Sequence, residues 1–152
     1  HVEERLYIPR KQLFASIRAG GRHIKSGRGS IMFAIGSTLQ IEPAKIFLDI
    51  PLPAWALNGG DPEVVNDPDE ITGQVAVWSD TVRNPATKGS NMRHRLILAP
   101  GLQFALTLLY DPTIVGDAQM ESALMRAGQL EGIGDGRRIG MGRFEVVSFE
   151  PK

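Results

Sequence analysis

The chain of 152 residues contains no cysteine. This absence excludes a disulfide framework, thiolate catalysis and any zinc site with sulfur ligands, and it is compatible with a reducing compartment. No apolar run approaches the roughly 18 residues of a membrane-spanning helix, and the amino end lacks the apolar segment of a signal peptide. We therefore expect a soluble protein, and the length fits a single domain over residues 1–152.

Long stretches of the chain also lack charge of one sign, although 17 Lys and Arg balance 17 Asp and Glu. Residues 5–41 contain no acid, residues 42–80 contain eight acids and one Lys, and residues 81–110 again contain no acid. Evenly mixed charge would argue against a polyanionic partner, whereas separate basic segments can converge on one positive surface. Ordinary solvated faces are the alternative interpretation of each segment.

In the first half of the chain, apolar spacing predicts a helix that begins near Pro9 and ends at Gly20, with a basic outer side. Residues 26–30 have the composition of a flexible basic loop. Prolines, a Gly-Gly pair and many acids predict a long loop or small insertion at residues 51–73. The strands expected in this half cover residues 5–8, 31–41 and 45–50.

In the second half, the best strand is expected at residues 102–109, where leucine and phenylalanine alternate with other residues. A helix is expected from an N-cap at Asp117 to Gly128. Further strands are expected at residues 74–78, 93–98 and 144–149. This order predicts an α+β, ferredoxin-like (RRM-like) fold, in which an antiparallel sheet has helices on one face.

The segment from Gly128 to Phe144 contains six glycines and three arginines. It follows a helix and leads into a strand, which is the reverse of the order in a dinucleotide-binding fingerprint. Glycines let the main chain pass close to a ligand with N–H groups facing phosphates, so the interleaved arginines predict a polyanionic ligand. A bulge and turn that only redirect the chain are the alternative.

Two segments carry a resemblance to a known family. Between its last expected helix and its final expected strand, the chain has the loop sequence Gly-Ile-Gly-Asp-Gly-Arg-Arg-Ile-Gly-Met-Gly-Arg-Phe at residues 132–144. This segment resembles the carboxyl-terminal glycine-rich loop of the RAMP superfamily, the ferredoxin-like RNA-binding subunits of CRISPR effector complexes. Residues 7–18, where an Ile-Pro opens a helix that ends in a basic residue, are similar to a second RAMP segment. Residues 78–95 resemble a group of phage-encoded proteins with the same ending.

The resemblance implies non-catalytic binding of single-stranded nucleic acid, most simply RNA, along a basic, glycine-rich surface. It implies a subunit of a CRISPR-like or phage nucleoprotein assembly in the cytoplasm of a prokaryotic or phage-infected cell, with other subunits or copies of itself as partners. Under this hypothesis the protein needs no membrane partner, cofactor, metal or catalytic residue. The residues expected to contact the strand are Arg18, Arg22, Lys25, Arg28, Lys88, Arg93, His94, Arg95, Gly132, Gly134, Gly136, Arg137, Arg138, Gly140, Gly142 and Arg143.

A metal-independent endoribonuclease is the first alternative, with His94 or His23 as general base and a nearby cation to hold the phosphate. His94 lies between Arg93 and Arg95, whose charges favour a neutral imidazole. Alternation along a strand places His94 on the face opposite these arginines, and it favours a half-buried structural histidine over a catalytic one.

A virus-encoded inhibitor or complex subunit that binds protein is the second alternative, with the acidic residues 42–80 facing a basic partner. The acids of residues 61–70 do not follow the spacing of a calcium loop, so a solvated acidic loop is favoured over a metal site.

Among the aromatic residues, Trp55 and Tyr110 lie at expected loop edges and are predicted to be exposed, where they could stack on bases. The other aromatic residues are expected to pack in the core.

Overall fold

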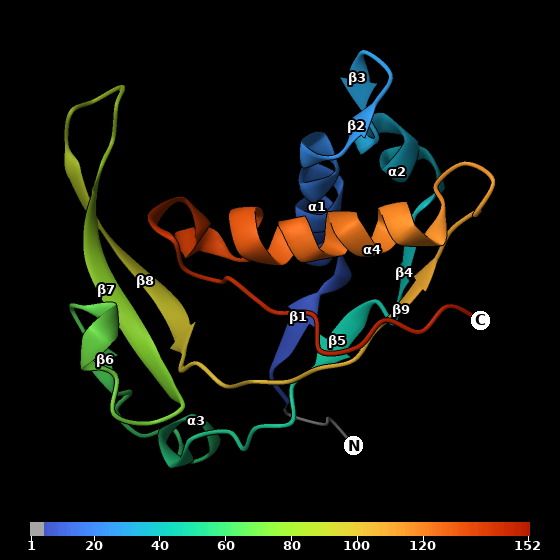
Figure 1. Ribbon diagram of the computed structural model, residues 1–152. Helices are drawn as coiled ribbons and strands as arrows, with labels where there is room; N and C mark the ends of the chain where they lie inside the picture. Colours follow the sequence, from blue (N-terminus) through green and yellow to red (C-terminus); the bar gives the residue numbers. More distant parts are fainter. Residues whose placement is uncertain (1–4) are drawn as a thin grey trace. The chain divides into compact units, whose positions relative to one another are not determined.

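The computed structural model describes residues 5–152 (Figure 1). The chain divides into two compact units: unit 1 comprises residues 5–6 and 47–104, and unit 2 comprises residues 7–46 and 105–152. Each unit has its own set of buried residues. The loop or insertion expected at residues 51–73 thus lies inside unit 1. That the whole chain forms a single domain stays a prediction.

Unit 2 opens with strand β1 (Tyr7–Pro9) and helix α1 (Arg10–Gly20). Pro9 precedes the helix with φ −64°, a value that proline fixes and that suits a helix start. Leu13 and Ile17 are 1% and 0% exposed, whereas the basic side chains of α1 are exposed. The predicted amphipathic helix with a basic outer side is therefore confirmed.

A basic hairpin follows α1. The 3-10 turn Gly21–His23 extends the helix, and strands β2 (Lys25–Ser26) and β3 (Gly29–Ser30) then pair antiparallel. Gly27 sits in the turn between them with φ 60°, a conformation that favours glycine. The residues expected as a flexible loop are thus a short hairpin.

The strand expected at residues 31–41 is wrong. This segment forms helix α2 (Met32–Thr38), followed by the short strand β4 (Gln40–Glu42). Ile31, Ile35 and Leu39 are 3%, 0% and 5% exposed, so the buried residues recur every four positions, which is the spacing of a helix. The β-branched composition that indicated a strand is overridden by this periodicity.

Short strand pairs complete the sheets of unit 2. Strand β5 (Lys45–Phe47) pairs with β1, and β9 (Thr107–Leu109) pairs antiparallel with β4. The strand expected at residues 102–109 is therefore mostly wrong: exposure alternates along it as predicted, but only three residues have a partner strand. Pro43, which has no N–H to donate, follows β4 directly and limits the ladder.

Helix α4 (Asp117–Arg126) follows β9. Gly116, not Asp117, occupies the N-cap position, and its N–H donates to the Gln119 side chain at 3.0 Å. The helix does not close at Gly128, because a wider turn continues over Ala127–Glu131 and ends at Gly132. In the described residues no strand follows β9, so the strand expected at residues 144–149 is wrong as well.

Small residues bring α1 and α4 into close contact where the two helices cross (Figure 1). A Cβ atom on Gly20 would overlap the carbonyl oxygen of Ala123 and lie 2.8 Å from the amide nitrogen of Ala127. Ala123 and Ala127 are both 0% exposed. Glycine at position 20 therefore permits this close approach to Ala123 of α4 and to Ala127 of the turn that continues it, which fixes the end of α1 against α4.

The described part of unit 1 contains a three-stranded sheet, one short α-helix and the 3-10 turn Pro68–Glu70. Strand β7 (Val75–Arg83) pairs antiparallel with β8 (Ser90–Leu98) and parallel with β6 (Val64–Val65). Helix α3 (Ala54–Asn58) lies in the segment that was expected to be a loop. The strands predicted at residues 74–78 and 93–98 are confirmed and extend further than expected.

The α+β class is confirmed, with four α-helices among the described residues and small, mainly antiparallel sheets. Each sheet of the described chain has two or three strands, and the ferredoxin-like arrangement of these strands stays a prediction.

We expect Gly20→Ala to lower the free energy of unfolding by about 1–3 kcal/mol, since overpacking in a close helix contact has this cost. Gly29→Ala is the matched control, because the nearest atom to its Cβ would be 4.0 Å away. This control should change stability by less than about 0.5 kcal/mol. Urea denaturation followed by circular dichroism measures both, and a Gly20→Ala variant as stable as the wild type would contradict the packing account.

Candidate nucleic-acid interface

Basic side chains gather at the carboxyl end of α1 and in the hairpin that follows it. Arg18 lies in the last turn of α1, Arg22 in the 3-10 turn, Lys25 in β2 and Arg28 in the hairpin turn, and all four are exposed. Figure 1 places the hairpin and α2 beside this end of α1. Because residues 5–41 contain no acid, the sequence supplies no local carboxylate to neutralise these cations.

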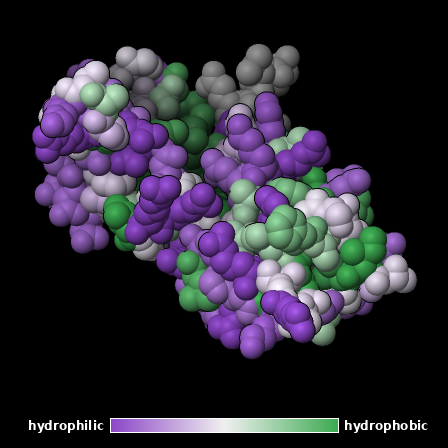
Figure 2. Space-filling model, turned by 90° about the horizontal axis from the view of Figure 1, so that it is seen from above, coloured by the Kyte–Doolittle hydropathy of each residue, from purple (hydrophilic) through white to green (hydrophobic). Residues whose placement is uncertain are grey.

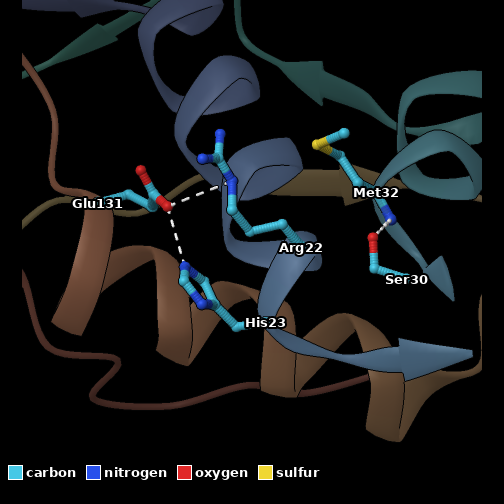
Figure 3. A network of polar contacts seen from close by, with 5 residues as sticks. All are labelled: Arg22, His23, Ser30, Met32 and Glu131. Carbon is cyan, nitrogen blue, oxygen red and sulfur yellow. Dashed lines mark hydrogen bonds and ion pairs between the residues drawn. The ribbon is translucent and has the colours of Figure 1, made fainter.

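Glu131 is the carboxylate that meets this basic segment. Its Oε1 lies 3.0 Å from His23 Nε2 and 3.7 Å from Arg22 Nε, as Figure 3 shows. The Glu131 side chain is 18% exposed, whereas that of Arg22 is 58% exposed. These two contacts of Glu131 therefore link the end of α1 to the beginning of the glycine-rich segment. They leave most of the Arg22 side chain exposed to solvent.

The glycine-rich segment is a closed loop held by its own main chain. Ile133 N donates to the Gly142 carbonyl at 3.0 Å, and Phe144 N donates to the Gly128 carbonyl at 3.2 Å. The Arg143 guanidinium donates to the Gln129 carbonyl at 2.7 Å. Arg143 therefore has a structural role in closing the loop, in addition to the contact with a nucleic-acid strand that was predicted for it.

Several glycines of this loop are explained by internal packing. A Cβ atom on Gly142 would overlap the Ile133 carbonyl oxygen, and one on Gly132 would lie 2.9 Å from the Met141 carbonyl oxygen. At Gly136 the obstacle is the Met141 side chain, with Sδ at 2.7 Å. These three positions need glycine to let the chain approach itself, which supports the structural alternative for them.

Gly134 and Gly140 differ from the other glycines of the loop. Both have positive φ, 86° and 87°, and an added Cβ would meet no atom within 4 Å at either position. Their main chain is thus accessible from outside the loop. These two glycines are the positions at which a ligand could approach the backbone closely.

Arg137 and Arg138 lie between these two open glycines, in the 3-10 turn Asp135–Ile139. Both arginines are exposed, and within residues 5–152 neither side chain has a hydrogen-bond or ion-pair partner. In the face seen in Figure 2, hydrophilic residues cover most of the surface and hydrophobic residues form small patches between them. Unit 2 contains two of the three basic segments that the sequence indicated, and Glu131 links the end of α1 to the start of the glycine-rich segment.

The third basic segment belongs to the β7–β8 hairpin of unit 1. Lys88, Arg93 and His94 are exposed. Arg95 differs, because its Nη2 donates to both carboxylate oxygens of Asp80 at 2.9 Å and its guanidinium carbon lies 4.1 Å from the centre of the Trp78 ring. Its side chain is 17% exposed. Arg95 is therefore held within the sheet, and its charge is neutralised.

His94 is exposed, so the prediction of a half-buried histidine is wrong. It shares a face of β8 with Met92 and Leu96, which are 66% and 59% exposed. The opposite face carries Arg95 and Ile97, which are more covered. Strand alternation was thus predicted correctly, but the buried face is the one that carries the arginines.

The acids of the segment 61–70 stabilise turns. Asp67 accepts a hydrogen bond from Asp69 N at 3.0 Å, and Glu63 accepts one from the Thr72 hydroxyl at 2.7 Å. Over residues 5–152 no group of three or more His, Asp or Glu is placed to hold a metal ion. This arrangement is that of a solvated acidic loop.

The exposed aromatic residues differ from those expected. Trp55 and Tyr110 are only partly exposed, whereas Phe33, which was expected in the core, is 73% exposed. The Tyr110 hydroxyl donates to Asp117 at 2.6 Å. Burial, that hydrogen bond and the Asp117 charge together raise the pKa of Tyr110 to about 12. The sequence signal for Phe33 was its place off the Ile31, Ile35, Leu39 stripe of α2.

No known protein family, curated protein or solved structure matches the chain. Within residues 5–152, every helix is too short or too polar to cross a membrane.

We expect Gly142→Ala to destabilise the protein more than Gly134→Ala. Both glycines have positive φ, which costs an alanine roughly 1–3 kcal/mol, but only Gly142 also faces a main-chain atom. The clash should add about 1–3 kcal/mol. Thermal unfolding of the two variants measures the difference, and equal midpoints would show that the loop does not close as described.

Proposed function

We propose that unit 2 binds single-stranded nucleic acid, most simply RNA, through the surface that combines the end of α1, the β2–β3 hairpin and the glycine-rich loop. The observation that carries the proposal is a set of exposed cations in one unit, of which only Arg22 has a carboxylate partner within residues 5–152. These cations are Arg18, Arg22, Lys25, Arg28, Arg137 and Arg138.

Phosphate contacts explain why this pattern suits a nucleic acid. Neutralising phosphates releases counterions, so cations held in one unit and kept apart from acids favour a polyanionic strand over a ligand with a single charge. The open main chain at Gly134 adds an N–H group near Arg137 and Arg138, whereas the Gly140 N–H already donates to the Arg137 carbonyl at 3.2 Å. A nucleic-acid strand can thus pass close to the backbone of this turn, which carries the two exposed arginines.

The resemblance of residues 7–18 and 132–144 to RAMP segments supports RNA over DNA, and it supports a ferredoxin-like arrangement of the strands and assembly with other subunits or copies. Both RAMP-like segments lie in unit 2, where Glu131 links their neighbouring elements through Arg22 and His23. In this proposal the protein positions the strand and does not cleave it. Lys88, Arg93 and His94 of unit 1 stay separate candidates for contact with a nucleic acid, whereas the neutralised Arg95 takes no part.

Salt dependence tests the proposal. For a single strand, each phosphate contact contributes roughly −0.7 to the slope of log affinity against log salt, so six contacting cations give a slope of about −4. Fluorescence anisotropy with a labelled oligonucleotide measures it. Arg137→Gln and Arg28→Gln should each make the slope less steep by about 0.7. Lys11→Gln, an exposed cation at the other end of α1, is the matched control and should leave the slope unchanged.

A flat salt slope, or no binding by the wild-type protein, would remove the proposal. Equal losses from Arg28→Gln and Lys11→Gln would show that the attraction comes from overall charge and not from this surface.

A second candidate function, a metal-independent endoribonuclease, is favoured by one observation. The Glu131 carboxylate lies 3.0 Å from His23 Nε2, and Arg22 is beside it (Figure 3). A carboxylate that orients an imidazole, next to a cation that can hold a phosphate, is the arrangement that general-base cleavage of RNA requires. His23 is therefore the better placed of the two candidate bases.

For this candidate, we expect His23→Ala to slow cleavage of single-stranded RNA in the presence of a chelator by roughly 10²- to 10⁴-fold, the usual contribution of a general base. His94→Ala is the control and should cleave at the wild-type rate. Gel analysis of a labelled RNA measures both rates. If the wild-type protein leaves the RNA intact, the protein only binds, as the first proposal states.

A further inference from the structure

Phe33 is the most exposed aromatic residue among those described, with 73% of its surface accessible. Its exposure follows from the geometry of α2, which turns Ile31, Ile35 and Leu39 into the core and leaves Phe33 on the outer side. Packing in the core does not explain a phenylalanine at this position. A single exposed apolar side chain is common on protein surfaces, so the argument for a ligand depends on what surrounds the ring.

Arg18 lies over this ring. Its guanidinium carbon is 5.9 Å from the centre of the Phe33 ring, within the range of a cation–π contact. Gly36 makes room for the arginine on α2, because a Cβ atom there would lie 2.9 Å from Arg18 Nε. Within residues 5–152, no carboxylate forms an ion pair with Arg18. The guanidinium thus rests against the ring with its charge uncompensated.

We propose that Phe33 and Arg18 form a binding site for one unpaired nucleotide, in which the base stacks on the exposed Phe33 ring and the adjoining phosphate pairs with the Arg18 guanidinium. This inference rests on the proposed function and assigns it a base contact. A stacking contact is tolerant of sequence, because every base offers a flat π face. The site therefore favours single strands over duplexes, in which the bases are covered.

The surroundings favour a nucleotide over an apolar protein partner. Phe33 lies in the acid-free segment 5–41, and Arg22, Lys25 and Arg28 of the same unit are exposed. A ring with Arg18 beside it, in a unit with further exposed cations, matches a ligand that combines flat bases with negative charge at regular spacing. If the partner of this surface were a protein, its binding would not depend on nucleobases.

The test compares an ordinary oligonucleotide with one of equal length that is abasic at every position. The wild-type protein should bind the ordinary strand roughly tenfold to a hundredfold more tightly, since removal of one stacking contact has an effect of this size. Phe33→Leu should bring the two affinities together without changing the salt slope. Phe33→Trp should keep the preference and should show quenched tryptophan emission when the strand binds.

Tyr7→Leu is the matched control. Tyr7 is another exposed aromatic residue of unit 2 with a cation on its ring, as Lys45 Nζ lies 5.0 Å from the ring centre. The Tyr7→Leu variant should keep the wild-type preference for the ordinary strand over the abasic strand. Because Phe33 is exposed, its leucine variant should unfold at the wild-type midpoint, which a thermal scan checks.

The outcomes separate this inference from the proposed function. If Phe33→Leu keeps the preference for bases while the salt slope is steep, the nucleotide site is wrong and the proposed function stands. If the wild-type protein binds both strands equally, or if Phe33→Leu and Tyr7→Leu lose the preference equally, the site is also wrong. If no strand binds, both proposals fail, and a protein partner of this surface replaces them.

Discussion

The close contact between α1 and α4 is the constraint on which the candidate interface depends. Gly20 lies against Ala123 and Ala127 with no room for another carbon atom, so the carboxyl end of α1 cannot shift along α4 without losing the contact. Glu131 lies in the turn that directly continues α4, and this position brings its carboxylate to Arg22. The basic end of one helix and the glycine-rich loop after the other are neighbours for this reason.

Charge is separated within the molecule even though the net charge is zero. Some cations are neutralised or engaged where they support the fold: Arg95 by Asp80 in the β7–β8 sheet, and Arg143 by a carbonyl oxygen of the glycine-rich loop. Other cations of unit 2 extend into solvent without a carboxylate among the described residues. Desolvating an arginine is costly unless its partners are fixed, so the exposed guanidinium groups are the ones that an incoming phosphate can meet at little cost.

Sequence patterns predicted α1, α4 and the β7–β8 strands, because each shows a periodicity that burial follows directly. They failed at residues 31–41, where β-branched composition hid a spacing of four, and at residues 102–109, where alternation was present but a partner strand was not. The basic residues of the interface could be identified from the lack of acids around them. The exposure of Phe33 was missed together with the helix at residues 31–41. The partners of Arg95 and the link from Glu131 to His23 could not be identified, because each depends on contacts between segments that are distant in the sequence.

The most direct test of the account is a nuclear magnetic resonance titration of the ¹⁵N-labelled chain with a single-stranded oligonucleotide at low salt. The account predicts that amide signals change position in residues 18–33 and 134–140 of unit 2, with smaller changes at the core of α4. Signal changes confined to residues 47–104, or none at saturating concentrations of the strand, would contradict it.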